Sequence, residues 1–70
     1  MENYYWKTEN PHSTNEETMH DFIDNHCELE IIEHDGTFAT GKDESGVLWG
    51  IYASGNGDFC NHMVSFEQLT

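Results

Sequence analysis

The sequence has almost no basic side chains. It contains no arginine and two lysines, Lys7 and Lys42, against fourteen aspartate and glutamate residues, which gives a net charge of −12 at pH 7. Proteins bind DNA or RNA with cationic side chains that replace the counterions of the phosphate backbone, so we expect no direct binding to nucleic acid. An anionic membrane surface repels the chain for the same reason. The partners that this charge attracts are basic surfaces on other proteins.

Long apolar runs are missing as well. No stretch approaches the roughly 20 apolar residues of a membrane-spanning helix, and no secretory apolar segment follows Met1. We therefore expect an intracellular, cytoplasmic protein that does not enter a membrane. In a reducing cytoplasm the two cysteines, Cys27 and Cys60, are expected to be free thiols.

What the sequence does contain is enough for one small folded domain over residues 1–70. A chain this short buries only about 60–65% of its unfolded surface, so its core is limited. Four phenylalanines, three tyrosines and two tryptophans are spread along the chain. That distribution disfavours intrinsic disorder, which is typical of acidic chains poor in aromatic residues.

An amphipathic helix is predicted from about residue 14 to about residue 26. Two overlapping capping boxes begin at Ser13 and Thr14, each with a glutamate three residues later, so the helix starts near residue 14 in either register. At about 100° per residue, one face collects the side chains expected to pack on the core. These are Met19, Phe22, Ile23 and His26, with Cys27 at the margin.

The other side of this helix carries a row of carboxylates at i, i+4, i+7 and i+11: Glu17, Asp21, Asp24 and Glu28. Like charges at this spacing repel each other, and no lysine or arginine lies between Lys7 and Lys42 to compensate them. Adjacent carboxylates of the row are about 5–6 Å apart, close to the roughly 6–7 Å between phosphates of one DNA strand. The row, extended by Glu30 on the next strand, is therefore predicted to imitate a phosphate backbone. The alternative is a solvated face on an acidic protein.

The second half of the chain predicts antiparallel β-structure. Residues 27–31 alternate polar and apolar side chains, with the leucine and isoleucine inward and the glutamates outward. Asp35-Gly36 is a hairpin-turn signal, followed by a returning strand over residues 37–40. Residues 47–53 are apolar on both faces, which predicts a central strand covered on both sides.

The aromatic segment 3–8 is expected to form either a short strand or an arm lying on the core. The helix and this segment are the expected covers of the two sides of the central strand. A turn at residues 54–58 and a last strand at residues 59–67 complete the pattern. The fold class is therefore α+β, with one N-terminal amphipathic helix packed on a small antiparallel sheet of three to five strands. A small SH3-like barrel with a helix is the alternative.

Metal binding is the sharpest alternative in chemical terms. Cys60 and His62 share one face of the predicted last strand, and the pair His26-Cys27 lies at the end of the helix. Neither cysteine belongs to a C-x2–4-C pair of the kind that zinc sites use. We therefore expect no metal and no other cofactor.

Catalysis has even less support. No nucleophile signature surrounds either cysteine. Acidic pairs such as Asp21 and Asp24 are placed on the exposed side of the helix, where burial cannot tune their pKa for acid–base chemistry. The chain is therefore expected not to be an enzyme.

In charge and size, though in no motif, the chain resembles the small acidic inhibitors of bacteriophages and mobile elements, among them DNA-mimicking anti-restriction and anti-CRISPR proteins. With the acidic row, this resemblance implies a non-enzymatic inhibitor that occupies the basic nucleic-acid-binding surface of a host defence or DNA-processing protein. The predicted partner-binding residues are Glu17, Asp21, Asp24, Glu28 and Glu30. The alternative is a small protein-interaction module or homodimer that uses its sheet and aromatic residues, with the acidic surface serving solubility.

Overall fold

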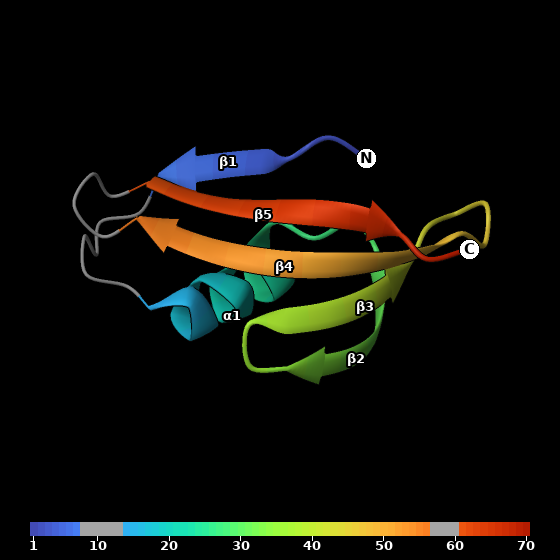
Figure 1. Ribbon diagram of the computed structural model, residues 1–70, viewed down its shortest axis with the longest axis horizontal. Helices are drawn as coiled ribbons and strands as arrows, with labels where there is room; N and C mark the ends of the chain where they lie inside the picture. The colour runs from blue at the N-terminus through green and yellow to red at the C-terminus, as the bar shows by residue number, and fades with distance from the viewer. Residues whose placement is uncertain (8–13, 57–60) are drawn as a thin grey trace.

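The computed structural model describes residues 1–7, 14–56 and 61–70. One helix packs on one face of an open, five-stranded antiparallel sheet with the strand order β1-β5-β4-β3-β2 (Figure 1). The elements are β1 Tyr4–Lys7, α1 Asn15–Asn25, β2 Glu30–Asp35, β3 Phe38–Lys42, β4 Leu48–Asn56 and β5 Asn61–Gln68. The α+β prediction is confirmed, with five strands. Since β1 and β2 are the two edges, the sheet is open and is not the SH3-like barrel of the alternative.

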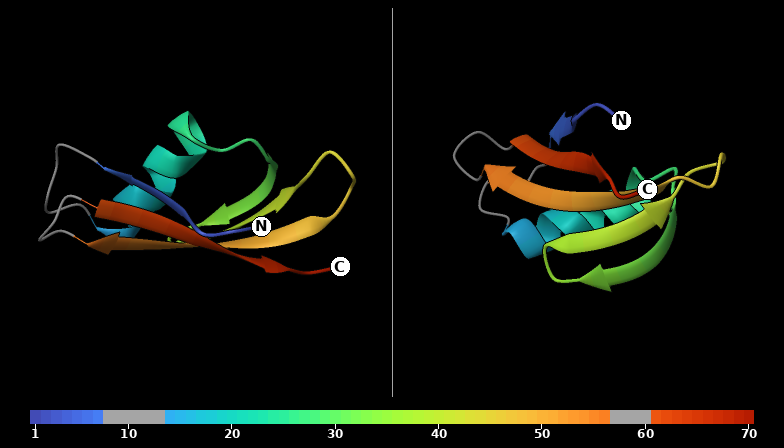
Figure 2. Two further views of the ribbon diagram at one scale, coloured as in Figure 1. Left: turned by 90° about the horizontal axis from the view of Figure 1, so that it is seen from above. Right: turned by 45° about the vertical axis from the view of Figure 1, so that its right-hand side comes forward.

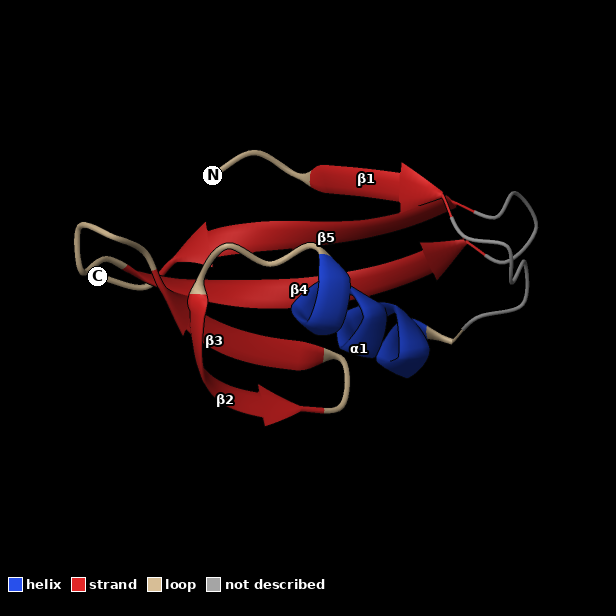
Figure 3. Cartoon of the chain, turned by 180° about the vertical axis from the view of Figure 1, so that it is seen from behind, coloured by secondary structure: helices blue, strands red, loops and turns tan. Residues whose placement is uncertain are grey.

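The helix covers one face of the sheet because of how the chain connects the two edges. Strands β2 to β5 form an antiparallel meander, whereas β1 adds to the far side of β5. The chain therefore has to pass from one edge of the sheet to the other between β1 and β2. Helix α1 lies in that connection and contacts β4 and β5 (Figures 2 and 3). Among the described residues, nothing covers the other face, which we call the open face.

Helix α1 begins where the capping pattern predicts. Thr14 is the N-cap, and its Oγ1 accepts a hydrogen bond from the backbone N–H of Glu17 at 3.1 Å. Ser13, the start of the other capping box, lies outside the described residues. The helix ends at Asn25, with His26 as its C-cap. No helix in the described part of the chain has the length and apolarity needed to cross a membrane.

The core lies between α1 and the middle of the sheet. Its buried apolar side chains are Met19, Phe22, Ala39, Ile51 and Val64. The predicted apolar face of the helix is therefore confirmed for Met19 and Phe22, and Ile23 packs against them partly buried. Thr18, which the periodicity did not select, is also buried. Its hydroxyl donates a hydrogen bond to the backbone carbonyl of Thr14. Because the hydroxyl has this partner inside the helix, the free-energy cost of burying it is small.

The short strand expected as one form of segment 3–8 is observed over Tyr4–Lys7, so the predicted covering of the central strand by this segment is wrong. The aromatic segment at the N-terminus does not lie over the sheet but extends it, with Tyr5 opposite Met63 and Trp6 opposite His62. As an edge strand, β1 pairs with backbone groups of β5 that would otherwise be unsatisfied. Trp6 points to the helix side, where its ring centroid is 5.9 Å from that of Phe22.

The strand boundaries also differ from those expected. The strand predicted over residues 27–31 begins only at Glu30, because the chain first turns from the helix into the sheet. Strand β4 continues through Asn56, into the turn expected at residues 54–58, and the rest of that turn lies outside the described residues. The hairpin signal at Asp35-Gly36 is confirmed: Asp35 pairs with Phe38, and Gly36 has a φ of 58°. This left-handed conformation favours glycine.

A single carboxylate organises the hairpin between β3 and β4. Asp43 Oδ1 accepts hydrogen bonds from the backbone N–H groups of Ser45 and Val47, at 2.9 and 3.0 Å. Asp43 Oδ2 accepts from the indole Nε1–H of Trp49 at 3.0 Å. These bonds, the one from Trp49 first among them, lower the pKa of Asp43 below its ordinary value. The fold therefore favours the charged form, and this stabilisation is present above about pH 4 and lost as the pH falls through the lowered pKa.

We expect Asp43→Asn to lower the melting temperature at pH 7 by several degrees. The amide keeps one acceptor oxygen, but it presents a donor where either Trp49 or the backbone also donates. Glu44→Gln removes the same charge from the exposed neighbouring residue and should leave the melting temperature nearly unchanged. Thermal unfolding followed by circular dichroism at pH 7 and pH 3 checks both points. Equal melting temperatures for the two variants at pH 7, or a deficit of Asp43→Asn that does not shrink at pH 3, would contradict this role.

Candidate protein-binding surface

The helix side of the molecule carries carboxylates and neither lysine nor arginine. Side chains alternate between the two faces of a strand. Lys7 follows Trp6, and Lys42 is three residues from the core residue Ala39, so both lysines point to the open face. The chain has no arginine and no further lysine. Both lysines are thus separated from α1 by the thickness of the sheet.

Two of the five predicted partner-binding residues lie on the outer surface of α1. Glu17 and Asp24 are exposed, and Glu16 beside them is exposed as well. Glu17 and Asp24 are two helical turns apart, which corresponds to about 10 Å along the axis. The sequence analysis did not select Glu16, although its position in the first turn of the helix is visible in the sequence.

Asp21, the middle residue of the predicted row, has a structural role. Trp6 Nε1 donates to Asp21 Oδ2 at 2.6 Å, and Asn25 Nδ2 donates to Asp21 Oδ1 at 2.7 Å. His26 Nε2 is 3.7 Å from Oδ2, and the Asp21 side chain is 39% exposed. The expectation that Asp21 lies on the exposed side of the helix therefore needs correction, because both oxygens are engaged and one holds β1 to α1. The helical spacing could not show this, since Trp6 approaches from a distant strand.

Glu28 and Glu30 do not continue the helical row. The helix ends at Asn25, so Glu28 lies in the segment that leads to β2, where it is exposed on the helix side. Glu30 pairs directly with Lys42 across the β2–β3 ladder and therefore points to the open face, beside one of the two lysines. The exposed carboxylates that α1 and the following segment present are thus Glu16, Glu17, Asp24 and Glu28, which we call the acidic surface.

An aromatic cluster joins β1, α1 and β5 next to the acidic surface. The Tyr4 hydroxyl lies 3.2 Å from His26 Nδ1, and the Trp6 ring lies between those of His26 and His62, at centroid distances of 4.9 and 5.7 Å. His62 is buried, with its Nδ1 at 2.5 Å from Thr18 Oγ1. Because the Thr18 hydroxyl donates its one proton to a backbone carbonyl, it accepts from His62 Nδ1–H. His62 Nε2 is then an acceptor and has no partner among the described residues.

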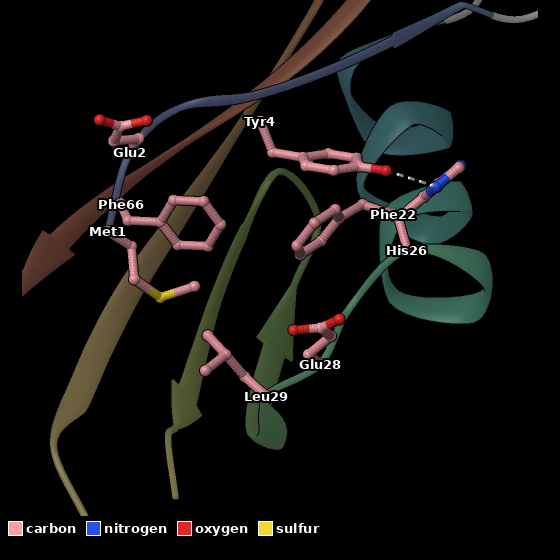
Figure 4. A pocket seen from close by; sticks show the side chains of 8 residues that line it. All are labelled: Met1, Glu2, Tyr4, Phe22, His26, Glu28, Leu29 and Phe66. Carbon is pink, nitrogen blue, oxygen red and sulfur yellow. Dashed lines mark hydrogen bonds between the residues drawn. The ribbon is translucent and has the colours of Figure 1, made fainter. Parts of the chain in front are cut away.

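A pocket of about 400 Å³ opens on the helix side, between β1, the end of α1 and β5. Figure 4 shows the residues that line it: Met1, Glu2, Tyr4, Phe22, His26, Glu28, Leu29 and Phe66. The sequence analysis missed this pocket because its walls come from the N-terminus, the helix, the following segment and the last strand. One carboxylate, Glu2, followed by three aromatic residues at positions 4–6 was the available signal, but it does not show what those residues face.

Metal binding by the histidines and cysteines was the alternative that the sequence left open, and the structure places these side chains as follows. Within residues 1–7, 14–56 and 61–70, no three histidine, cysteine or acidic side chains come together so as to hold a metal ion. His26 contacts the aromatic cluster, whereas Cys27 Sγ donates to the carbonyl of Leu29 at 3.5 Å. Burial raises the pKa of the Cys27 thiol, and the Glu28 carboxylate adds to that rise. Cys60, the expected neighbour of His62, lies outside the described residues.

The helix side therefore combines an acidic surface, a carboxylate that fastens β1 to α1, and an open pocket. Compared with known protein families, with curated proteins and with solved structures, the chain shows no significant match.

Proposed function

We propose that the protein is a non-enzymatic inhibitor that binds the basic nucleic-acid-binding surface of another protein through its acidic surface. The observation that supports this function best is that both lysines lie on the face opposite the acidic surface. The carboxylates of α1 and the segment after it face solvent on one side, and both lysines face the other.

The separation matters because neighbouring lysines would neutralise the carboxylates that a partner has to meet. Glu16, Glu17 and Asp24 stand on one rigid helix, so lysine and arginine side chains of a partner meet carboxylates at fixed spacing. Asp21 adds to the same negative potential, although its oxygens are engaged within the protein. A surface of one sign also speeds diffusional encounter with a basic groove, and nucleic acid would compete for that groove.

The variant Glu16→Gln with Asp24→Asn tests this function. We expect it to bind the partner roughly tenfold more weakly, because two charges of the contact are lost. The matched control, Glu30→Gln with Glu33→Gln, removes two charges from exposed residues of β2 whose ladder positions face away from α1. Both variants and the unmodified protein are used as bait in bacterial lysate at low and high salt, with mass spectrometry of the captured proteins and an added DNA or RNA duplex as competitor.

We expect the unmodified protein to capture nucleic-acid-binding proteins, and the duplex to displace them. The capture should weaken at high salt. It should be lost with the Glu16→Gln, Asp24→Asn variant and kept with the control variant. Capture that neither the helix variant nor the duplex reduces would overturn the proposal.

A second function, an interaction module or homodimer, is favoured by one observation on the open face. The rings of Phe38 and Tyr52 lie over Gly50 with centroids 5.0 Å apart, and Leu69 closes the group. Tyr52 and Leu69 are 40% and 46% exposed. Association through this apolar group would persist at high salt and in the Glu16→Gln, Asp24→Asn variant, so the same experiment separates the two functions.

A further inference from the structure

We propose that the pocket on the helix side binds an arginine side chain of the basic partner. This inference rests on the proposed function and adds which side chain the partner inserts and where. The inference is based on the shape and lining of the pocket, which has an apolar floor and carboxylates at its mouth. An acidic surface without a pocket would not distinguish one basic side chain of the partner from another.

The floor of the pocket fits the aliphatic part of a long side chain. Phe22 of α1 and Phe66 of β5 meet edge to face with centroids 5.9 Å apart, and Leu29 continues this apolar surface. The Tyr4 ring lies 6.0 Å from that of Phe22 and forms another wall. A volume of about 400 Å³ is at the lower end of the range for ligand pockets and exceeds what one side chain needs. The methylene groups of an arginine can therefore pack on this floor.

The mouth of the pocket fits the charged end of the same side chain. Glu2 and Glu28 line it and are exposed, and they lie on opposite sides of it in the view of Figure 4. Ionised carboxylates only accept hydrogen bonds, whereas a guanidinium offers five N–H donors in one plane. That plane also stacks on aromatic rings, which a lysine ammonium does less well. The aromatic walls therefore favour arginine over lysine.

Other occupants fit the pocket less well. A phosphate or carboxylate is repelled by Glu2 and Glu28, whose two negative charges exceed the one positive charge of the Met1 α-amino group, and both lysines lie on the open face. An uncharged apolar side chain would cover the floor but would take water from the carboxylates without replacing their hydrogen bonds. The Met1 side chain, which lines the pocket and is itself exposed, is flexible enough to move aside for an entering group.

The test uses N-acetyl-arginine-N-methylamide as the probe and two-dimensional NMR of the isotope-labelled protein as the readout. We expect saturable shifts of the backbone amides of Phe22, Leu29 and Phe66. The corresponding citrulline derivative, which has nearly the same shape without the charge, should bind at least tenfold more weakly, and the lysine derivative should bind several-fold more weakly. The variant Glu2→Gln with Glu28→Gln should lose at least tenfold in arginine affinity. Its matched control, Glu33→Gln with Asp35→Asn on β2, should lose less than twofold.

Equal binding of the citrulline and arginine derivatives, or shifts confined to other residues, would overturn the pocket assignment. Applied to partner capture, the same variants separate the two proposals. Capture that depends on Glu16 and Asp24 but not on Glu2 and Glu28 would overturn the pocket and leave the proposed function standing. Arginine binding in the pocket with capture that ignores both pairs would show that the pocket takes arginine, but it would overturn both the assignment of that arginine to the partner and the proposed function.

Discussion

Ile51→Ala is expected to lower the free energy of unfolding by about 2–5 kcal/mol. The Ile51 side chain is 0% exposed and lies at the middle of β4, opposite Ala39 on one side and Phe66 on the other. Removing its outer carbons leaves a cavity between the sheet and α1 that a core of five buried apolar side chains cannot easily fill. A domain of 70 residues has a total stability of roughly 4–10 kcal/mol, so this loss removes a large part of it.

Ile32→Ala is the matched control for Ile51→Ala. Ile32 has the same side chain but is 52% exposed, at the irregularity between Ile31 and Glu33 on the edge strand β2. We expect its replacement to change the free energy of unfolding by about 0.5 kcal/mol or less. Urea denaturation followed by tryptophan fluorescence measures both variants. Similar losses for Ile51 and Ile32 would mean that the core does not lie where α1 meets β4.

The second large effect is expected for Asp21→Asn, which should destabilise the fold by about 1–2 kcal/mol. Asp21 accepts hydrogen bonds on both oxygens, from Trp6 and from Asn25. Asparagine has one acceptor oxygen, so one of these donors would face an NH₂ group. The value lies in the lower part of the range for charged hydrogen bonds because the side chain is 39% exposed and water can partly replace the lost partner.

Asp24→Asn, one turn along the helix, removes the same charge from an exposed position and should cost little stability. In addition to denaturation, amide hydrogen exchange of β1 reports the effect directly, because the Trp6–Asp21 hydrogen bond joins that edge strand to the helix. We expect faster exchange of the β1 amides that pair with β5 in Asp21→Asn and unchanged exchange in Asp24→Asn. Equal stability of the two variants with unchanged exchange would return Asp21 to the set of partner-binding residues.

Local patterns accounted for the elements that depend on near neighbours in the sequence. Thr14 caps a helix because its hydroxyl reaches an amide three residues later, and Met19 and Phe22 are buried because they share a face of that helix. The turn at Asp35-Gly36 follows from the conformation that Gly36 adopts within a hairpin. Each of these depends on interactions within about one turn, which a sequence shows directly.

Contacts between distant segments decided the rest of the candidate site. Strand β1 joins β5 some sixty residues later, and only this pairing brings Trp6 to Asp21 and removes that carboxylate from the acidic row. The end of the helix at Asn25 took Glu28 out of the row, and the ladder register turned Glu30 to the open face.

The sequence by itself determined the charge of this protein, the start of its helix, the face that the helix buries and the α+β class, because composition, caps and periodicity are local properties of the chain. The tertiary structure alone decided which carboxylates face a partner, where both lysines point, and that a pocket forms among Tyr4, Phe22 and Phe66. The physical reason is that strand order and register set the direction of each side chain, and both result from backbone pairing between segments far apart in the sequence.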